Sequence, residues 1–144
     1  MQGWASDARM PRSLESRKHG TQENQQGSAV AEFVMVSALL IAVFMGILQL
    51  TFALHVRNTL MDAAAAGARY GTLADRGPGD GVRRTQELIR GALNDRFASD
   101  VHATRIDIGG TPGVRITVRA GIPLFGMVPF VGEFVVQGES VRYG

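Results

Sequence analysis

Residues 29–54 read AVAEFVMVSALLIAVFMGILQLTFAL, and this stretch decides the architecture of the chain. Glu32 is its only ionisable side chain, and Gln49 is the only strongly polar side chain that follows. A helix of this length spans roughly 39 Å at about 1.5 Å per residue, more than the roughly 30 Å of a bilayer's hydrocarbon core. A helix in the core of a soluble domain rarely stays apolar on every face for so long. The sequence therefore predicts a transmembrane helix over residues 28–56, surrounded by membrane lipid.

A cleaved secretory signal is the first alternative, because Ala64, Ala65 and Ala66 are similar to the small residues at such cleavage sites. The apolar region of a secretory signal holds only about 7 to 15 residues. Here the apolar run is much longer, and Arg57 and Asp62 separate it from the three alanines. A membrane anchor that stays in the protein is the better interpretation.

The polar residues 1–27, rich in Gln, Ser, Arg and Glu, are interpreted as a disordered leader. Basic residues lie close to the apolar run on both sides, three before it and two after it: Arg12, Arg17, Lys18, Arg57 and Arg69. Because basic residues favour the cytoplasmic side, this small excess predicts a cytoplasmic N-terminus and places residues 57–144 outside the cytoplasm. The expected location is the cytoplasmic membrane, with a single span.

Beyond the membrane the helical pattern continues through residues 56–71. Residues 75–81, DRGPGDG, form a loop, and Asp80 is expected to cap a second, amphipathic helix over residues 82–97. The apolar stripe of that helix requires a surface on which to pack.

An antiparallel sheet of two or three strands supplies that surface. Alternating apolar and polar residues predict strands at 105–108 and 114–119, joined by a hairpin at GGTPG, residues 109–113. A third strand is expected at 133–142, although Gly138 interrupts its alternation. The apolar residues 122–132 contain two prolines and are too short to cross a bilayer. The fold class is α+β: a long transmembrane helix continuing outside the membrane, a second helix and a small sheet.

Composition argues against several functions. The 144 residues carry a formal charge of only +2, dispersed along the chain, which is too little for a nucleic-acid surface. There is no cysteine, the three histidines show no metal spacing, and the glycines of residues 75–81 lack the Lys-Ser/Thr of a phosphate loop. We therefore expect no catalytic residues, metal, cofactor, nucleic acid or small-molecule substrate, and no enzyme activity.

The strongest local motif lies where the apolar helix begins. Gly27 is followed by SAVAEF, so Glu32 and Phe33 are the fifth and sixth residues after the glycine. A glycine lets an extended backbone enter a peptidase cleft, because it has no Cβ. A carboxylate within an apolar helix is costly at mid-membrane, less so near the edge, and usually has a partner. Glu32 is interpreted either as a paired, functional group or as a boundary residue that reaches headgroup water.

This motif resembles the processing site of type IV prepilins, and specifically of the Flp and TadE-like members of the tight-adherence (Tad) pilus family. The resemblance implies that a prepilin peptidase cuts between Gly27 and Ser28. It also implies that Glu32 pairs with the free amine of Ser28 on a neighbouring subunit. The Ala-rich residues 58–71 and the C-terminal residues 114–143 also resemble TadE-like proteins. Major Flp pilins end soon after their helix, so the longer chain here implies a minor pilin or pseudopilin.

Ala63, Gly67 and Gly71 place small residues on one helix face at intervals of four. This face is interpreted either as a contact with another subunit or as a contact within the chain's own domain. The leading hypothesis is a TadE-like pseudopilin with a structural role in assembling an adhesive Tad pilus, in contact with other pilin-like subunits or the assembly platform. The alternative is an uncleaved, single-pass envelope protein with a small partner-binding domain.

Overall fold

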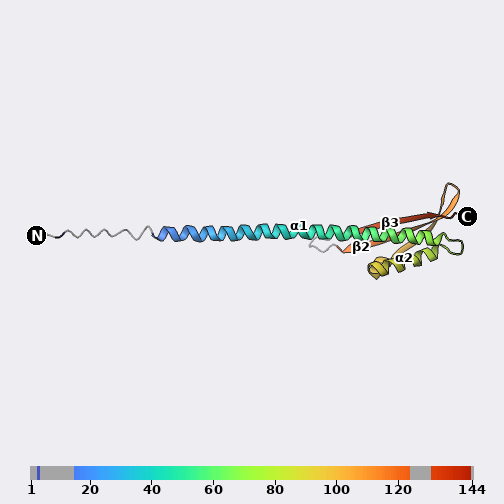
Figure 1. Cartoon of the computed structure of the whole chain (residues 1–144), viewed down its shortest axis with the longest axis horizontal. Helices are drawn as coiled ribbons and strands as arrows, with labels where there is room; N and C mark the ends of the chain where they lie inside the picture. The colour runs from blue at the N-terminus through green and yellow to red at the C-terminus, as the bar shows by residue number, and fades with distance from the viewer. Residues whose placement is uncertain (1–2, 4–14, 124–130, 144) are drawn as a thin grey trace. The chain divides into compact units, whose positions relative to one another are not determined.

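The computed structural model describes Gly3, residues 15–123 and residues 131–143. Its helices are α1 (Glu15–Gly71), α2 (Pro78–Ala92) and a short 3-10 helix, η1 (Asp95–Ala98). Its strands are β1 (Asp100–Ile108), β2 (Thr111–Pro123) and β3 (Val131–Val141) (Figure 1). The chain divides into two compact units, Met1–Met45 and Gly46–Gly144. The predicted α+β class, with a long apolar helix, a second helix and a three-stranded antiparallel sheet, is confirmed.

The described part of the first unit is almost entirely the N-terminal portion of α1. This helix begins at Glu15, so the prediction that residues 1–27 are disordered is wrong for residues 15–27. Residues 15–27 contain no proline, and adding residues to a helix that already exists avoids the cost of nucleation. The side chains of residues 25–45 are exposed, except for the half-buried Ser37.

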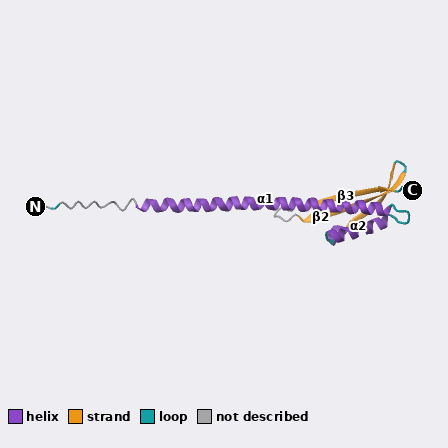
Figure 2. Ribbon diagram, in the orientation of Figure 1, coloured by secondary structure: helices purple, strands orange, loops and turns teal. Residues whose placement is uncertain are grey.

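The second unit has a hydrophobic core formed by the C-terminal part of α1, by α2, by η1 and by one face of the sheet. The strand order is β1-β2-β3 with both pairs antiparallel, and Figure 2 shows β2 and β3 alongside this part of α1. Burying a large apolar side chain stabilises a fold by about 1.5 to 3 kcal/mol. The largest fully buried side chains are Val56, Leu60, Thr85, Ile89, Ile116 and Val118.

Two glycines form the turn of the β1–β2 hairpin. Gly109 and Gly110 have φ values of 62° and 83°, and Ile108 pairs with Thr111. Positive φ at both central residues is the backbone twist that suits a two-residue hairpin, and glycine adopts it without steric cost. The predicted hairpin at residues 109–113 is therefore too long, because residues 111–113 already belong to β2.

This tight turn sets the register of β1, and the register places Arg105 opposite Val114. Residues that face each other across an antiparallel pair lie on the same face of the sheet, so Arg105 shares the face of the buried Val114. Ile106 and Ile108 lie on the other face, where Ile108 is 47% exposed. The expected alternation of β1 is present, but its isoleucines do not form the core.

Helix α2 begins and ends earlier than predicted. It starts at Pro78, with Gly77 as the N-cap residue, and it stops at Ala92 instead of residue 97. Asp80 is the third helical residue, and its carboxylate accepts the backbone N–H of Gly77 at 3.0 Å. This hydrogen bond and the charge of Arg83 lower the pKa of Asp80 below its ordinary value. Asp80 therefore stabilises the helix start, although not from the N-cap position.

The third strand is present as predicted, extending over Val131–Val141. It pairs with β2 along its whole length, from Val131 opposite Pro123 to Val141 opposite Gly113. Of the predicted apolar segment 122–132, residues 124–130 lie outside the described residues.

Candidate functional site

The motif from Gly27 to Phe33 lies entirely within α1. The backbone at Gly27 is helical, and a Cβ added there would meet nothing within 4 Å. Phe33 is 72% exposed, and Ser28 and Glu32 are exposed as well. All four residues are therefore accessible, in this chain, to an external molecule.

Glu32 has no hydrogen-bonding or ionic partner among the described residues. Ser28 stands four positions earlier on the same helix, and side chains four apart are neighbours on one helix face. A positive charge at position 28 would therefore lie about one helical turn from the carboxylate. The chain itself offers Glu32 a place for a counter-charge, but no such charge is present while Gly27 and Ser28 are joined.

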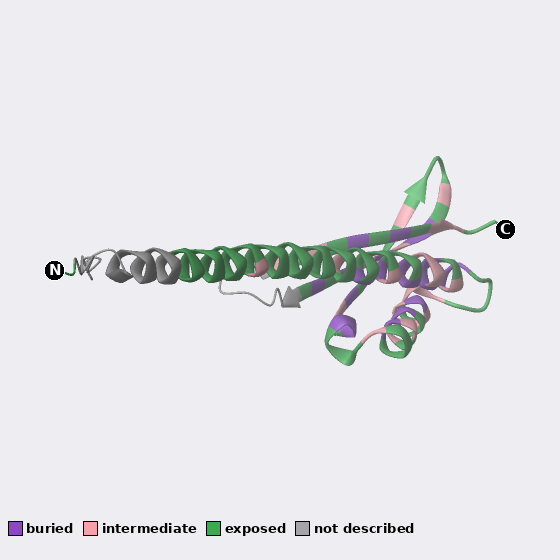
Figure 3. Cartoon of the chain, turned by 60° about the vertical axis from the view of Figure 1, so that its left-hand side comes forward, coloured by how far each residue is buried: buried purple, intermediate pink, exposed green. Residues whose placement is uncertain are grey.

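The apolar run that follows exposes its side chains on every side. Figure 3 shows this part of α1 as exposed, whereas buried residues gather in the second unit. Within the described residues, one helical segment, Gln25–Gly71, is long and apolar enough to cross a membrane, and its most apolar window has a mean hydropathy of 2.5 with none of it buried. The exposed large apolar side chains include Val34, Leu39, Leu40, Ile41, Phe44 and Leu50.

The small-residue face of α1 is covered by the chain's own domain. A Cβ on Gly67 would lie 1.8 Å from Thr85 Oγ1 and 2.7 Å from the carbonyl oxygen of Gly81, both in α2. A Cβ on Gly71 would lie 3.2 Å from the carbonyl oxygen of Gly77. Ala63 is buried too. Of the two interpretations of this face, the structure shows the contact within the domain.

Gly138 provides a second close approach, which the sequence interpretation missed. A Cβ at this position would lie 2.3 Å from the backbone nitrogen of Ala65 and 2.4 Å from the carbonyl carbon of Ala64. The strand therefore packs directly against the backbone of α1. The interrupted alternation of β3 was the available signal, because a glycine within a strand often marks such an approach.

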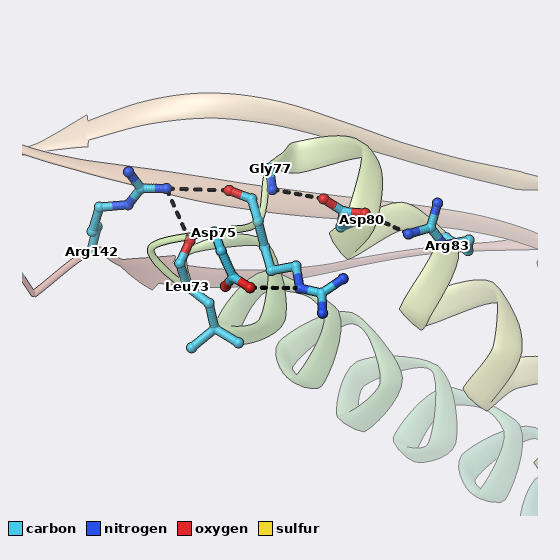
Figure 4. Close-up of polar contacts among 7 residues, drawn as sticks. Leu73, Asp75, Gly77, Asp80, Arg83 and Arg142 are labelled. Atoms are coloured by element: carbon cyan, nitrogen blue, oxygen red, sulfur yellow. Dashed lines mark hydrogen bonds and ion pairs between the residues drawn. The ribbon is translucent and has the colours of Figure 1, made fainter.

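The sequence also contains no indication of the role of Arg142, which follows β3. Its Nε donates to the carbonyl oxygen of Thr72 at 3.1 Å, and its Nη2 donates to those of Leu73 and Arg76 at 3.2 and 3.3 Å. Figure 4 shows the guanidinium reaching across to the α1–α2 loop. The carbonyls after a helix end need partners, and a basic side chain meets that need.

Metal-binding side chains do not gather in the part of the chain that the structure describes. There, no three His, Asp or Glu side chains are placed to share a metal ion. His102 lies 2.7 Å from Asp100 on β1, with both side chains partly exposed. His55, on α1, is exposed.

These features define a membrane-anchored protein, with one apolar helix near the N-terminus and a small α+β domain. Residues 27–69 match the protein family described as TadE-like protein, which confirms the resemblance inferred from the sequence. The match starts at Gly27 and does not reach residues 114–143, whose resemblance to the family stays a prediction. No curated protein and no solved structure matches the chain.

Proposed function

We propose that this protein is a TadE-like pseudopilin that a prepilin peptidase cuts between Gly27 and Ser28, and that it has a structural role in assembling a Tad pilus. Its domain, residues 57–144, lies outside the cytoplasm. It acts by helix packing within the membrane and by contacts with pilin-like subunits or the assembly platform, without catalysis.

The observation that carries this proposal is where the TadE-like match begins. It starts at Gly27, the glycine that the motif singles out, and Glu32 and Phe33 follow at the fifth and sixth positions. The exposed apolar surface of residues 28–54 adds support, because it offers helix-packing partners many contacts within the lipid.

Cleavage would supply the charge that Glu32 lacks. Cutting the bond after Gly27 leaves a free amine on Ser28, and an α-amino group is largely protonated at neutral pH. A carboxylate in the bilayer without a partner costs about 2.5 to 3.5 kcal/mol at mid-membrane on insertion scales, so an ammonium group nearby favours the charged pair. In a filament or platform, the amine of a neighbouring copy can serve in the same way.

The helical backbone at Gly27 makes local unwinding part of the cleavage step. A peptidase binds its substrate extended, so the helix must open around the scissile bond. Glycine lowers the cost of opening, because it is about 1 kcal/mol less favourable in a helix than alanine. Gly27 thus both weakens the helix and leaves room for the peptidase.

We predict that Gly27→Val slows processing by about tenfold or more, because the added side chain obstructs the approach of the peptidase. Mass spectrometry of membrane-extracted protein, from cells with an active prepilin peptidase, should find a mature chain that begins at Ser28. Gly20→Val, in the same helix but seven residues upstream, is the control and should be processed normally. An intact N-terminus in the unsubstituted protein would contradict the proposal.

Glu32→Ala separates processing from assembly. Removing the carboxylate lowers the cost of membrane insertion, so the variant should reach the membrane and be cut, yet assemble poorly because the amine of Ser28 loses its counter-charge. Normal pilus formation by this variant would leave Glu32 as a boundary residue.

The orientation is tested by labelling. A cysteine placed at Ser99 should react with a membrane-impermeant reagent in spheroplasts. A cysteine at Ser13, in the Gly27→Val variant that keeps residues 1–27, should not react until the membrane is opened. This pattern is expected because basic residues favour the cytoplasmic side. Labelling at Ser13 alone would reverse the topology.

An uncleaved membrane anchor with a partner-binding domain is the second candidate. The continuity of α1 through Gly27 favours it, because a peptide bond within a helix is a poor substrate for a peptidase. The mass of the mature chain decides between the two candidates.

A further inference from the structure

Three arginines from separate parts of the second unit line one cavity of about 200 Å³. Arg76 comes from the α1–α2 loop, Arg105 from β1, and Arg142 from the residues after β3. The cavity lies where α1 ends, α2 begins and the β1–β2 hairpin approaches them. The folded domain therefore brings together three basic residues that are far apart in the sequence.

The positive charge in this cavity is only partly compensated. No Asp or Glu is among the described residues that line it. The guanidinium of Arg76 lies 3.6 Å from the exposed Asp75 and 5.0 Å from the centre of the Tyr70 ring, which does not line the cavity. The cationic groups left to the cavity are therefore those of Arg105 and Arg142. Arg105 has no ionic partner among the described residues, and Arg142 uses Nε and Nη2 for carbonyl oxygens, which leaves its Nη1 available.

The nearest other carboxylates are already engaged. Asp80 accepts the backbone N–H of Gly77 and pairs with Arg83 (Figure 4). Asp107 accepts the backbone N–H of Gly110 at 2.8 Å. Neither carboxylate is free to pair with the exposed Arg105 and Arg142, so an acidic group of another molecule can do so.

The rest of the lining indicates the shape of that molecule. Pro78, Pro112 and Val114 supply an apolar wall beside Arg105 and Arg142. The cavity is smaller than the roughly 300 to 1,000 Å³ of sites for drug-sized ligands. It suits one carboxylate on a short aliphatic stem, and a guanidinium binds a carboxylate through two parallel hydrogen bonds.

We propose that this cavity binds an acidic side chain, flanked by aliphatic residues, in a peptide segment of a protein partner. The apolar wall favours a peptide over a bare inorganic anion, which could not use it. The cavity does not involve residues 27–33, so the proposal holds whether or not the chain is processed after Gly27.

The test uses the full-length protein in detergent micelles and two peptides, acetyl-Leu-Glu-Leu-amide and acetyl-Leu-Gln-Leu-amide. The glutamate peptide should shift the NMR signals of the backbone amides of Gly77 and Gly113, which border the cavity, and should bind about tenfold more tightly than the glutamine peptide. Inorganic phosphate serves as the second probe and should bind more weakly than the glutamate peptide.

Arg105→Gln should weaken binding of the glutamate peptide by about tenfold, because this guanidinium has no structural hydrogen bond to lose. Arg119→Gln removes the same charge from an exposed position on the opposite face of the sheet and should change affinity by less than about twofold. Equal loss in the two variants, equal binding of the two peptides, or tighter binding of phosphate would each overturn the proposal. Thermal unfolding of both variants confirms that the domain is intact.

Discussion

Replacing Gly138 with alanine is expected to lower the free energy of unfolding of the domain by about 3 kcal/mol, at the upper end of the range for overpacked sites. The new Cβ would lie 2.3 Å from the nitrogen of Ala65 and 2.4 and 2.6 Å from the carbonyl carbon and oxygen of Ala64. All three are backbone atoms of a helix, so no side-chain rotation relieves the clash. The strand or the helix must move, and the core around Ile116, which pairs with Gly138, loosens with it.

Hydrogen exchange of the buried backbone amides of Ile116 and Val118 measures this loss, because such amides exchange through opening of the core. Gly132→Ala is the matched control. It makes the same chemical change in the same strand, but a Cβ there meets nothing within 4 Å. If the two variants exchange alike, β3 does not pack against α1 as described.

Gly67→Ala is expected to cost about 2 kcal/mol in the same measurement. Its Cβ would overlap Thr85 Oγ1, which is fully buried and donates to the carbonyl oxygen of Gly81 at 2.9 Å. The threonine cannot turn away without losing that hydrogen bond, and the carbonyl oxygen of Gly81 itself lies 2.7 Å from the new Cβ. Helix α2 must therefore move away from α1.

Gly91→Ala, in α2, should have the opposite effect. Gly91 is exposed and has open space around its Cα, so alanine there should stabilise the helix by up to about 1 kcal/mol through its higher helix propensity. If Gly91→Ala destabilised the domain as much as Gly67→Ala, the loss at Gly67 could not be assigned to a clash between α1 and α2.

The contact of Gly67 and Gly71 with α2 limits what substitutions on the small-residue face of α1 can test. Gly67 and Gly71 already pack against α2 within the domain. Variants at these positions will therefore disturb the fold of the domain before they report on contacts between subunits. Residues 28–54, whose side chains are almost all exposed, are the better place to seek subunit contacts through the membrane.

Hydropathy and local motifs alone determined the membrane anchor and the TadE-like motif. Residues 29–54 predict a span because composition sets the cost of placing a helix in lipid, and no distant contact is needed. The position of Glu32 after Gly27 is likewise local. The alternation in residues 114–118 also identified a strand with one buried face correctly, because its period of two is a property of the strand itself.

Tertiary structure alone decided which face of β1 meets the core and which residues meet across the domain. Arg105 shares the core-side face because the two-residue turn sets the pairing register, and a shift of one residue would have exchanged the two faces. Arg142 donates to the carbonyl oxygen of Thr72, 70 positions away, and Gly138 packs directly against the backbone of α1. Local periodicity carries no information about such contacts, because they depend on which distant segments the packed core brings together.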